Sequence, residues 1–237
     1  MSVFLADPDR QGERDIRRAW SLLDDEERAR AHDLRAPRDQ QTFVVAHGLL
    51  RTVLARATGQ DARSIRFART RHGRPELAGN AGPASTLSRF NLSHTQGLVG
   101  CAVVAAGDVD VGLDLEEVRT PAPLDVAHRY FSSEELAGLR ALPPAGQSDR
   151  FYALWTLKEA YLKGRGIGHH LRLDSFTVYP APGGRARLAG PEPGEDGRAW
   201  TLRWWRYARH AVALAVRAPA ARVRVTMSAE MKIGDSD

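Results

Sequence analysis

The chain of 237 residues has a single cysteine, Cys101, and no apolar run of the roughly 18 residues that a membrane-spanning helix needs. One cysteine excludes an internal disulfide framework and fits a reducing compartment. Cys101 lies in the apolar run GLVGCAVV, so we expect a buried structural thiol rather than a nucleophile. The N-terminus MSVFLADPDR lacks the apolar segment of a signal peptide. We therefore expect a cytoplasmic protein that does not enter a membrane.

Lysine is scarce as well. The chain has only Lys158, Lys163 and Lys232, and every other side chain with a fixed positive charge is an arginine. Two of these three lysines fall in the segment WTLKEAYLK (155–163), where Glu159 lies between them. Because lysine presents a compact ammonium and arginine a planar fork, this clustering indicates a local chemical use for the ammonium.

The bulk composition is that of an ordinary globular protein, with 43% hydrophobic and 27% charged residues. Its length suffices for one large domain or two small ones. The net charge is +5, and the segment RSIRFARTRHGR (63–74) has five arginines and no carboxylate. Such a segment suits nucleic acid, a phosphorylated small molecule or an acidic protein, or else is a solvated edge strand, and charge alone does not decide among these.

The chain contains an internal repeat with an offset of 108 residues. Glu26-Glu27 in LLDDEERARA (22–31) matches Glu134-Glu135 in YFSSEELAGL (130–139), and both pairs follow residues that cap helix starts. The same offset relates two longer helical patterns, TFVVAHGLLRTVLA and RFYALWTLKEAYLK, each followed by β-type sequence. The order of helix, helix, strand and later strand therefore occurs twice.

This repeat predicts an α/β (α+β) fold, a pseudo-dimer of two similar halves related by a pseudo-two-fold axis; chance matching of helical patterns is the alternative. We expect an N-terminal half at 1–107, a C-terminal half at 108–217 and a loosely held tail at 218–237. The cleft between the two halves would be the natural ligand site.

The segment VGLDLEEV (111–118) alternates as a strand does, with Asp114 and Glu116 on one face and apolar residues on the other. Two neighbouring carboxylates repel each other unless a cation lies between them. Oxygen ligands of this kind suit Mg²⁺, which takes substrate phosphate oxygens as further ligands. An exposed acidic strand face is the alternative interpretation.

On a helix, Glu159 and Lys163 share one face at a spacing of i and i+4, and Lys158 lies beside them. An ordinary surface ion pair is the alternative. The apolar residues around these three indicate a packed helix, however, in which a charged pair calls for a partner. Together with Asp114 and Glu116, they predict a site for magnesium and pyrophosphate.

Two loops expected in the first half offer further residues that could bind a ligand. Ser93 and His94 in NLSHT precede an apolar strand, and Arg74 in RHGRPEL lies between a glycine and a proline in a rigid turn. His94 by itself is as compatible with a structural role as with a binding role.

Five segments, taken in order, resemble the Sfp-type, or surfactin-type, 4′-phosphopantetheinyl transferases. They are GRP (73–75), NLSHT (91–95), VGLDLE (111–116), FYALWTLKEAYLKGRGIG (151–168) and LDSF (173–176). The resemblance implies transfer of the phosphopantetheine arm of coenzyme A to a serine of a carrier protein, with release of adenosine 3′,5′-bisphosphate. It also implies two similar α/β halves.

The resemblance further implies a role for each residue singled out above. Asp114, Glu116 and Glu159 would bind Mg²⁺, with Mn²⁺ as the alternative, and Glu159 would also accept the serine proton. Lys158 and Lys163 would be catalytic, because they would stabilise charge on the pyrophosphate. The phosphates of coenzyme A, including the 3′-phosphate, would be bound by Arg30, Arg74, Ser93 and His94, and its adenine would lie near Gly73 and Pro75.

The chain departs from the family pattern in its first half. Glu27 stands in the first helix where a basic phosphate ligand is often found, and Thr42 replaces a common arginine. Phe43, the next residue, offers no hydrogen-bond donor in its place.

The implied partners are small acidic helical carrier proteins of fatty-acid, polyketide, nonribosomal-peptide or siderophore synthases. The positive net charge suits such partners, and we expect a monomeric enzyme to dock them beside Arg165 and Arg172. An arginine-rich nucleic-acid-binding protein is the alternative, but it leaves the three carboxylates without a use, because they would repel a nucleic-acid backbone. A coenzyme A-binding module without catalysis would need neither the carboxylates nor both lysines.

Overall fold

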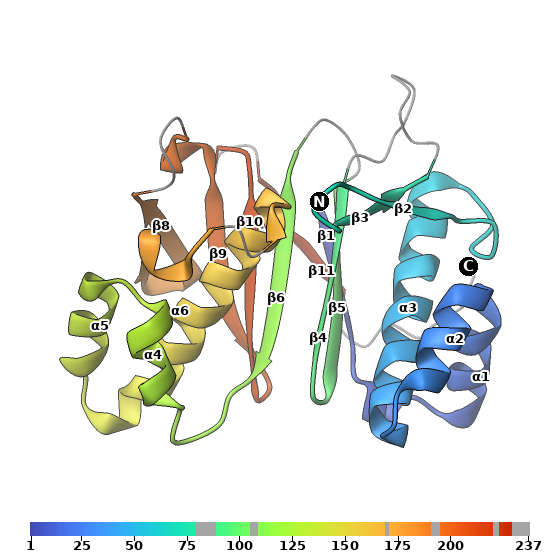
Figure 1. Cartoon of the computed structure of the whole chain (residues 1–237), viewed down its shortest axis with the longest axis horizontal. Coiled ribbons are helices and arrows are strands. Elements are labelled where there is room, and N and C mark those ends of the chain that lie inside the picture. Colours follow the sequence, from blue (N-terminus) through green and yellow to red (C-terminus); the bar gives the residue numbers. More distant parts are fainter. Residues whose placement is uncertain (79–88, 105–108, 169–170, 191–194, 220–222, 229–237) are drawn as a thin grey trace. The chain divides into compact units, whose positions relative to one another are not determined.

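A computed structural model of the chain describes residues 1–78, 89–104, 109–168, 171–190, 195–219 and 223–228 (Figure 1). The chain forms two compact units. Unit 1 comprises Met1–Arg71, Pro75–Asp108 and Val225–Asp237, and unit 2 comprises His72–Arg74 and Val109–Arg224. Both contain helices and sheets, which confirms the α/β (α+β) class. The pseudo-two-fold axis and the cleft between halves stay predictions, and the expected boundary between residues 107 and 108 lies outside the described residues.

Unit 1 packs a long helix on a four-stranded sheet. The helices are α1 (Glu13–Leu22), α2 (Asp25–Asp33) and α3 (Pro37–Thr58), after a 3-10 turn η1 (Pro8–Arg10). The sheet has the order β11-β1-β5-β4, with β1 (Ser2–Ala6), β4 (Arg89–Thr95), β5 (Leu98–Val104) and β11 (Thr226–Ser228). A separate ribbon pairs β2 (Phe67–Arg69) with β3 (Pro75–Leu77).

The core of unit 1 lies between α3 and this sheet. Leu49 and Val53 of α3 belong to one cluster with Val99, Cys101 and Val103 of β5. Cys101 is fully buried, and burial raises the pKa of its thiol, so the expected structural thiol is confirmed.

The C-terminal segment contributes one strand to unit 1. Residues Thr226–Ser228 form β11, which pairs in parallel with β1 at the start of the chain. All three residues are exposed. The pairing attaches these three residues of the segment 218–237, which we expected to be loosely held, to the sheet of unit 1. Residues 220–222 and 229–237 lie outside the described residues.

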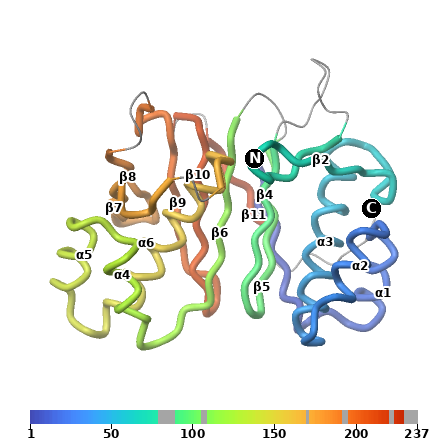
Figure 2. The backbone as a smooth tube through the Cα atoms, in the orientation of Figure 1, coloured from blue at the N-terminus to red at the C-terminus, as the bar shows by residue number. Residues whose placement is uncertain are grey.

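Unit 2 packs the second long helix on an antiparallel sheet of order β6-β10-β9-β8-β7 (Figure 2). Its helices are α4 (Leu124–Tyr130), α5 (Ser133–Arg140) and α6 (Pro144–Arg165). Its strands are β6 (Val111–Glu117), β7 (Thr177–Ala181), β8 (Arg185–Ala189), β9 (Thr201–Tyr207) and β10 (His210–Val216). Short 3-10 turns are η3 (Leu173–Ser175), η4 (Pro182–Gly184) and η5 (Gly197–Ala199). Of the helices that the structure describes, none combines the length and apolarity required to cross a membrane.

The predicted helix starts are confirmed in both units. Asp24 and Glu27 form a capping box at the start of α2, and Ser132 and Glu135 form one at the start of α5, each 108 residues further on. Helices α3 and α6 have 22 residues each, begin with a proline and end at a glycine in the left-handed conformation. The order of a short capped helix followed by a long one therefore recurs in both units.

In unit 1 the capping glutamate is tied to the long helix by a buried arginine. Arg51 of α3 is fully buried, and its Nε donates to Glu27 Oε2 at 2.7 Å. Its Nη2 donates to Asp24 Oδ2 at 2.6 Å, and its Nη1 donates to the carbonyls of Ala62 and Ile65 at 3.0 and 3.1 Å. One guanidinium thus joins the start of α2, the middle of α3 and the loop that leads into β2.

In unit 2 helix α6 touches strand β6 with its backbone. A Cβ placed on Gly112 of β6 would lie 1.9 Å from the carbonyl oxygen of Ala160 and 2.3 Å from the nitrogen of Gly164. Gly112 therefore faces α6, and strand alternation turns Asp114 and Glu116 the same way. Asp114 is buried, which excludes the exposed acidic strand face.

Because α6 lies so close to Gly112, we expect a single methyl group added there to reduce the stability of the fold. We expect Gly112→Ala to lower the free energy of unfolding by roughly 1–3 kcal/mol or more, because β6 or α6 must shift to admit the Cβ. Gly138→Ala in α5 is the matched control. A Cβ there meets nothing within 4 Å, and alanine favours the helix by up to about 1 kcal/mol. Urea unfolding measures both changes, and equal stability of the two variants would contradict the close packing.

Candidate functional site

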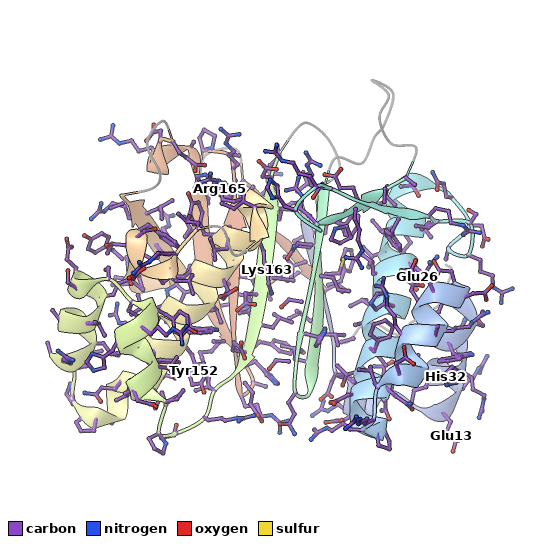
Figure 3. The ribbon with its side chains drawn as sticks, viewed as in Figure 1. Glu13, Glu26, His32, Tyr152, Lys163 and Arg165 are labelled. Carbon is purple, nitrogen blue, oxygen red and sulfur yellow. The ribbon has the colours of Figure 1, made fainter. Side chains whose placement is uncertain are left out.

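The last turns of α6 bring a lysine to the acidic face of β6. Lys163, labelled in Figure 3, donates from Nζ to Asp114 Oδ1 at 2.6 Å. The Asp114 side chain is 6% exposed, whereas the Lys163 side chain is 32% exposed. The close approach at Gly112 and Gly164 is what lets this side chain reach the strand. The structure therefore joins two of the predicted site residues, one from each motif.

The other two predicted carboxylates lie on the same pair of elements. Glu159 precedes Lys163 by one turn of α6, and Glu116 follows Asp114 on the same face of β6; both are half-buried. Three carboxylates from a strand and a helix in contact are the donor type that a hard divalent cation prefers. In the part of the chain that the structure describes, however, no group of three His, Cys, Asp or Glu side chains is assembled so that it could hold a metal ion. The donor chemistry fits Mg²⁺, and Lys163 neutralises Asp114.

Lys158 does not lie where the sequence analysis expects it. Its side chain is fully buried, and Nζ donates at 2.7 Å to each carboxylate oxygen of Glu135 and at 2.6 Å to the carbonyl of Phe176. Its three N–H groups thus face three protein acceptors. Burial lowers the pKa of Lys158, and the charge of Glu135 opposes this only in part.

The expectation that Lys158 contacts a pyrophosphate is therefore not supported, and the physical reason is helical geometry. Five residues along an α-helix turn about 140°, so Lys158 and Lys163 lie on different faces of α6. Lys158 faces α5 and the residue before β7, and Lys163 faces β6. The capping box at Ser132 was the sequence signal that could have indicated this contact, because its glutamate, Glu135, needs a cation when it is buried.

Unit 1 contains a cavity of about 500 Å³ that gathers three of the residues predicted to bind a ligand. Arg30, Pro75 and His94 line it. Its apolar wall consists of Phe43, Leu50, Phe67 and Leu92, and its further cations are Arg66 and Arg69. Two arginines of the basic segment 63–74 therefore border a concave site rather than only a solvated edge.

The carboxylates of this cavity restrain its arginines. Arg30 forms an ion pair with Glu26 one turn earlier in α2. Glu27 accepts from Arg51 on one oxygen and lies 2.8 Å from Nδ1 of His47 with the other. Burial raises the pKa of Glu27, but the hydrogen bonds from His47 and Arg51 outweigh it and hold the pKa below its usual value. Glu27 is therefore ionised.

His47 lines the cavity but was not among the residues expected from the sequence, and Phe43 was named there only as lacking a hydrogen-bond donor. Their rings stack at 4.0 Å with an interplanar angle of 21°, and both line the cavity. Their spacing of four residues on α3 was a detectable signal, since such residues share a helix face. Nothing in the sequence placed that face toward Glu27.

The remaining predicted residues are divided between the units. Ser93 is buried in β4. Gly73 has a φ of +84°, which favours glycine, and it directs Arg74 toward the end of α6. There Nη1 of Arg74 lies 3.3 Å from both the Gly164 carbonyl and Asp110 Oδ1. Arg74 thus reaches the helix end that carries Lys163.

Comparison with known proteins places these features in a family context. Residues 110–215 match the model of the 4′-phosphopantetheinyl transferase superfamily, and residues 10–107 match the model of the 4′-phosphopantetheinyl transferase N-terminal region. A 4′-phosphopantetheinyl transferase of Bacillus subtilis is 32% identical over 190 residues, 80% of either chain. HetI of Nostoc sp. is 32% identical over 193 residues, 81% of this chain and 77% of that one. Sfp of Bacillus subtilis is 31% identical over 175 residues, 74% of either chain.

Solved structures give a weaker similarity. A holo-(acyl-carrier-protein) synthase from Bacillus anthracis, in complex with CoA (3′,5′-ADP), is 21% identical, with a TM-score of 0.40. The match covers 47% of this chain and 96% of that chain.

The two lysines of α6 should respond differently to removal of their charge. We expect Lys158→Met to lower the free energy of unfolding by about 3–5 kcal/mol, because it leaves the carboxylate of Glu135 buried without its cation. Lys163→Met also removes the cation of a buried carboxylate, Asp114, but a third of the Lys163 side chain is exposed, so water can replace the ammonium and the loss of stability should be smaller. Urea unfolding of each variant measures the difference.

The double variant Lys158→Met, Glu135→Gln is the control for this explanation. It removes the unpaired charge while keeping an amide oxygen that accepts from the backbone nitrogen of Val178, so stability should recover in part. A double variant no more stable than Lys158→Met would mean that the ion pair is not the cause.

Proposed function

Because the chain belongs to the 4′-phosphopantetheinyl transferase family, we propose that it moves the phosphopantetheine arm of coenzyme A to a serine of a carrier protein. The serine oxygen forms a bond to the phosphorus next to pantetheine. The bond from that phosphorus to the bridging oxygen breaks, and adenosine 3′,5′-bisphosphate leaves. The observation that carries this proposal is the contact of Lys163 with Asp114, which unites the two motifs of the resemblance at one place.

Three carboxylates and one lysine supply the chemistry in this proposal. Asp114, Glu116 and Glu159 would hold Mg²⁺, or Mn²⁺, whose charge would offset that of the pyrophosphate. Glu159 accepts the proton of the carrier serine, directly or through water. Lys163, at the exposed end of the pair, stabilises the charge that develops on the leaving group. Lys158 acts at a distance, by fixing the rotation of α6 through Glu135.

The adenosine bisphosphate end of coenzyme A occupies the cavity of unit 1 in this proposal. Arg30 and His94 bind phosphate there, and Pro75 lies near adenine. Ser93 and Gly73 act indirectly, because each precedes a residue that binds phosphate, His94 and Arg74 respectively. Arg74, held beside the last turn of α6, binds the pyrophosphate with Lys163.

The nucleic-acid alternative is less well supported by these contacts. Four of the five arginines of segment 63–74, namely Arg63, Arg66, Arg69 and Arg71, are exposed, so the support for this alternative depends on what the arginines contact. Arg66 donates to two backbone carbonyls, and Arg74 donates to Asp110 and a helix end. Glu26 and Glu27 line the same cavity beside its arginines, so its charge is mixed rather than the continuous positive surface that a nucleic-acid backbone requires. A small ligand with one localised phosphate fits better.

A variant of the metal ligand tests the reaction. We expect Asp114→Asn to reduce transfer by about a thousandfold at saturating coenzyme A, because it removes a carboxylate from the site while keeping its shape. Glu117→Gln is the matched control on the same strand, where Glu117 points to the opposite face and pairs with Arg119 and Arg209. Mass spectrometry of a panel of apo carrier proteins, incubated with coenzyme A and Mg²⁺, measures the transfer. Wild-type enzyme that modifies no carrier would refute the function, and an Asp114→Asn variant with full activity would refute the metal assignment.

A groove of about 330 Å³ in unit 2 is the docking surface that we propose for the carrier. Its apolar residues are Leu162, Leu171, Leu173 and Tyr130, and its charged residues are Arg129, Arg172 and Asp174, whose carboxylate pairs with Arg172 at 2.6 Å. The Arg172 side chain is 81% exposed. An acidic helical carrier can place an apolar side chain in the groove and carboxylates beside the arginines.

The second arginine expected at this surface is engaged elsewhere. Arg165 is largely buried, donates to the hydroxyl of Tyr161 at 3.0 Å and pairs with Glu195. Trp200 Nε1 also donates to Glu195, at 2.7 Å. This network fixes the end of α6 to the segment before β9, so Arg129 replaces Arg165 in the proposal.

Charge reversal tests the docking surface. We expect Arg129→Glu with Arg172→Glu to lower kcat/KM for an acidic carrier at least tenfold in dilute buffer, with a smaller change in kcat, because complementary charge mainly speeds encounter. For wild-type enzyme, raising salt from about 50 to 500 mM shortens the Debye length from about 14 Å to about 4 Å and should have a similar effect. Arg14→Glu with Arg17→Glu on the exposed side of α1 is the control of equal charge. Equal losses in the two double variants would exclude a specific groove.

A further inference from the structure

His47 lies between a buried carboxylate and the cavity of unit 1. Its Nδ1 is 2.8 Å from Glu27 Oε1, its ring stacks on Phe43, and it lines the cavity. Its side chain is 20% exposed. The ring is therefore held in one orientation, by a charge on one edge and an aromatic face beside it.

The partner of Nδ1, Glu27, determines which ring nitrogen of His47 can gain a proton. Glu27 is ionised, so it can only accept hydrogen bonds, and His47 Nδ1 must carry a hydrogen. In the neutral ring, Nε2 then carries a lone pair, for which the described residues provide no donor. Protonation at Nε2 would replace that lone pair with an N–H donor and add one positive charge. The charge of Glu27 would stabilise this imidazolium.

The fixed charges around the cavity do not fully balance the charge of a bound phosphate monoester, so the site can accommodate one more positive charge. Its lining includes the carboxylates Asp24, Glu26 and Glu27 from the region of α2, and the guanidiniums Arg30, Arg66 and Arg69. Arg51, beneath Glu27, adds a fourth guanidinium, so four positive charges stand against three negative ones. A phosphate monoester carries about 1.5 to 2 negative charges near pH 7. The excess of one positive charge is less than such a group requires.

We propose that His47 takes up a proton when a phosphate monoester enters this cavity and thereby acts as a pH-dependent determinant of ligand affinity. The proposal rests on the proposed function in one respect: the monoester is the 3′-phosphate of coenzyme A. Affinity for coenzyme A is then higher at lower pH. His94, the other histidine of the lining, comes from β4 and is the competing proton acceptor.

Calorimetry of the wild-type protein tests proton uptake directly. Coenzyme A is titrated near pH 7.5 in buffers of different ionisation enthalpy, and the dependence of the observed heat on that enthalpy gives the protons taken up per ligand. We expect a clear fractional uptake with coenzyme A and much less with 3′-dephospho-coenzyme A. In NMR spectra at the same pH, the His47 ring signals should move toward those of a protonated ring when coenzyme A is added.

Three histidine variants assign the proton. His47→Gln can still donate to Glu27, so the fold should persist; uptake should vanish and the dissociation constant for coenzyme A should rise about tenfold. His128→Gln, at an exposed residue of α4 that contacts Arg140, should change neither quantity. Uptake that persists in His47→Gln and disappears in His94→Gln would overturn the proposal, as would wild-type binding without uptake. A wild-type protein that does not bind coenzyme A at all would refute the proposed function instead.

Discussion

A buried ion pair between a capping glutamate and a cation of the long helix organises each unit of this protein. Glu27 binds Arg51 in unit 1, and Glu135 binds Lys158 in unit 2. Each carboxylate also completes the capping box of a short helix, and each cation also reaches a carbonyl beyond the long helix, at Ile65 or Phe176. Because a buried charge is costly once its partner is lost, these pairs fix three segments at a time. The rotation of α6, and with it the direction of Glu159 and Lys163, follows from the pair in unit 2.

The contact between Lys163 and Asp114 depends equally on how closely the backbones of α6 and β6 approach each other. Gly112 on β6 and Gly164 on α6 leave no room for a side chain between strand and helix. This proximity lets an ammonium of ordinary length reach Asp114 while the rest of the lysine stays partly exposed. The motif VGLDLE therefore makes two contributions. It supplies two carboxylates, and its glycine, Gly112, lets helix α6 come close enough to reach them.

Local patterns predicted the local parts of this structure. The offset of 108 residues located both capping boxes, and strand alternation placed Asp114 and Glu116 on one face. The sequence did not reveal which face of a helix meets which partner, because that depends on packing between distant segments. Lys158 and Arg165 were expected to meet ligand and carrier, yet Glu135 and Glu195 hold them. His47 was overlooked for the same reason, since only the fold brings α3 against Glu27.

The pairing of β1 with β11 makes unit 2, in the order of the chain, an insertion within unit 1. The first and last described strands are neighbours in one sheet, and Val109–Arg224 come between them. During synthesis, the segments of unit 2 leave the ribosome before the last strand of unit 1 does. Three residues of the early chain, His72–Arg74, also belong to unit 2, where Arg74 bonds the Gly164 carbonyl. A single cut at the middle of the chain would thus yield two fragments, each lacking a piece of its own unit.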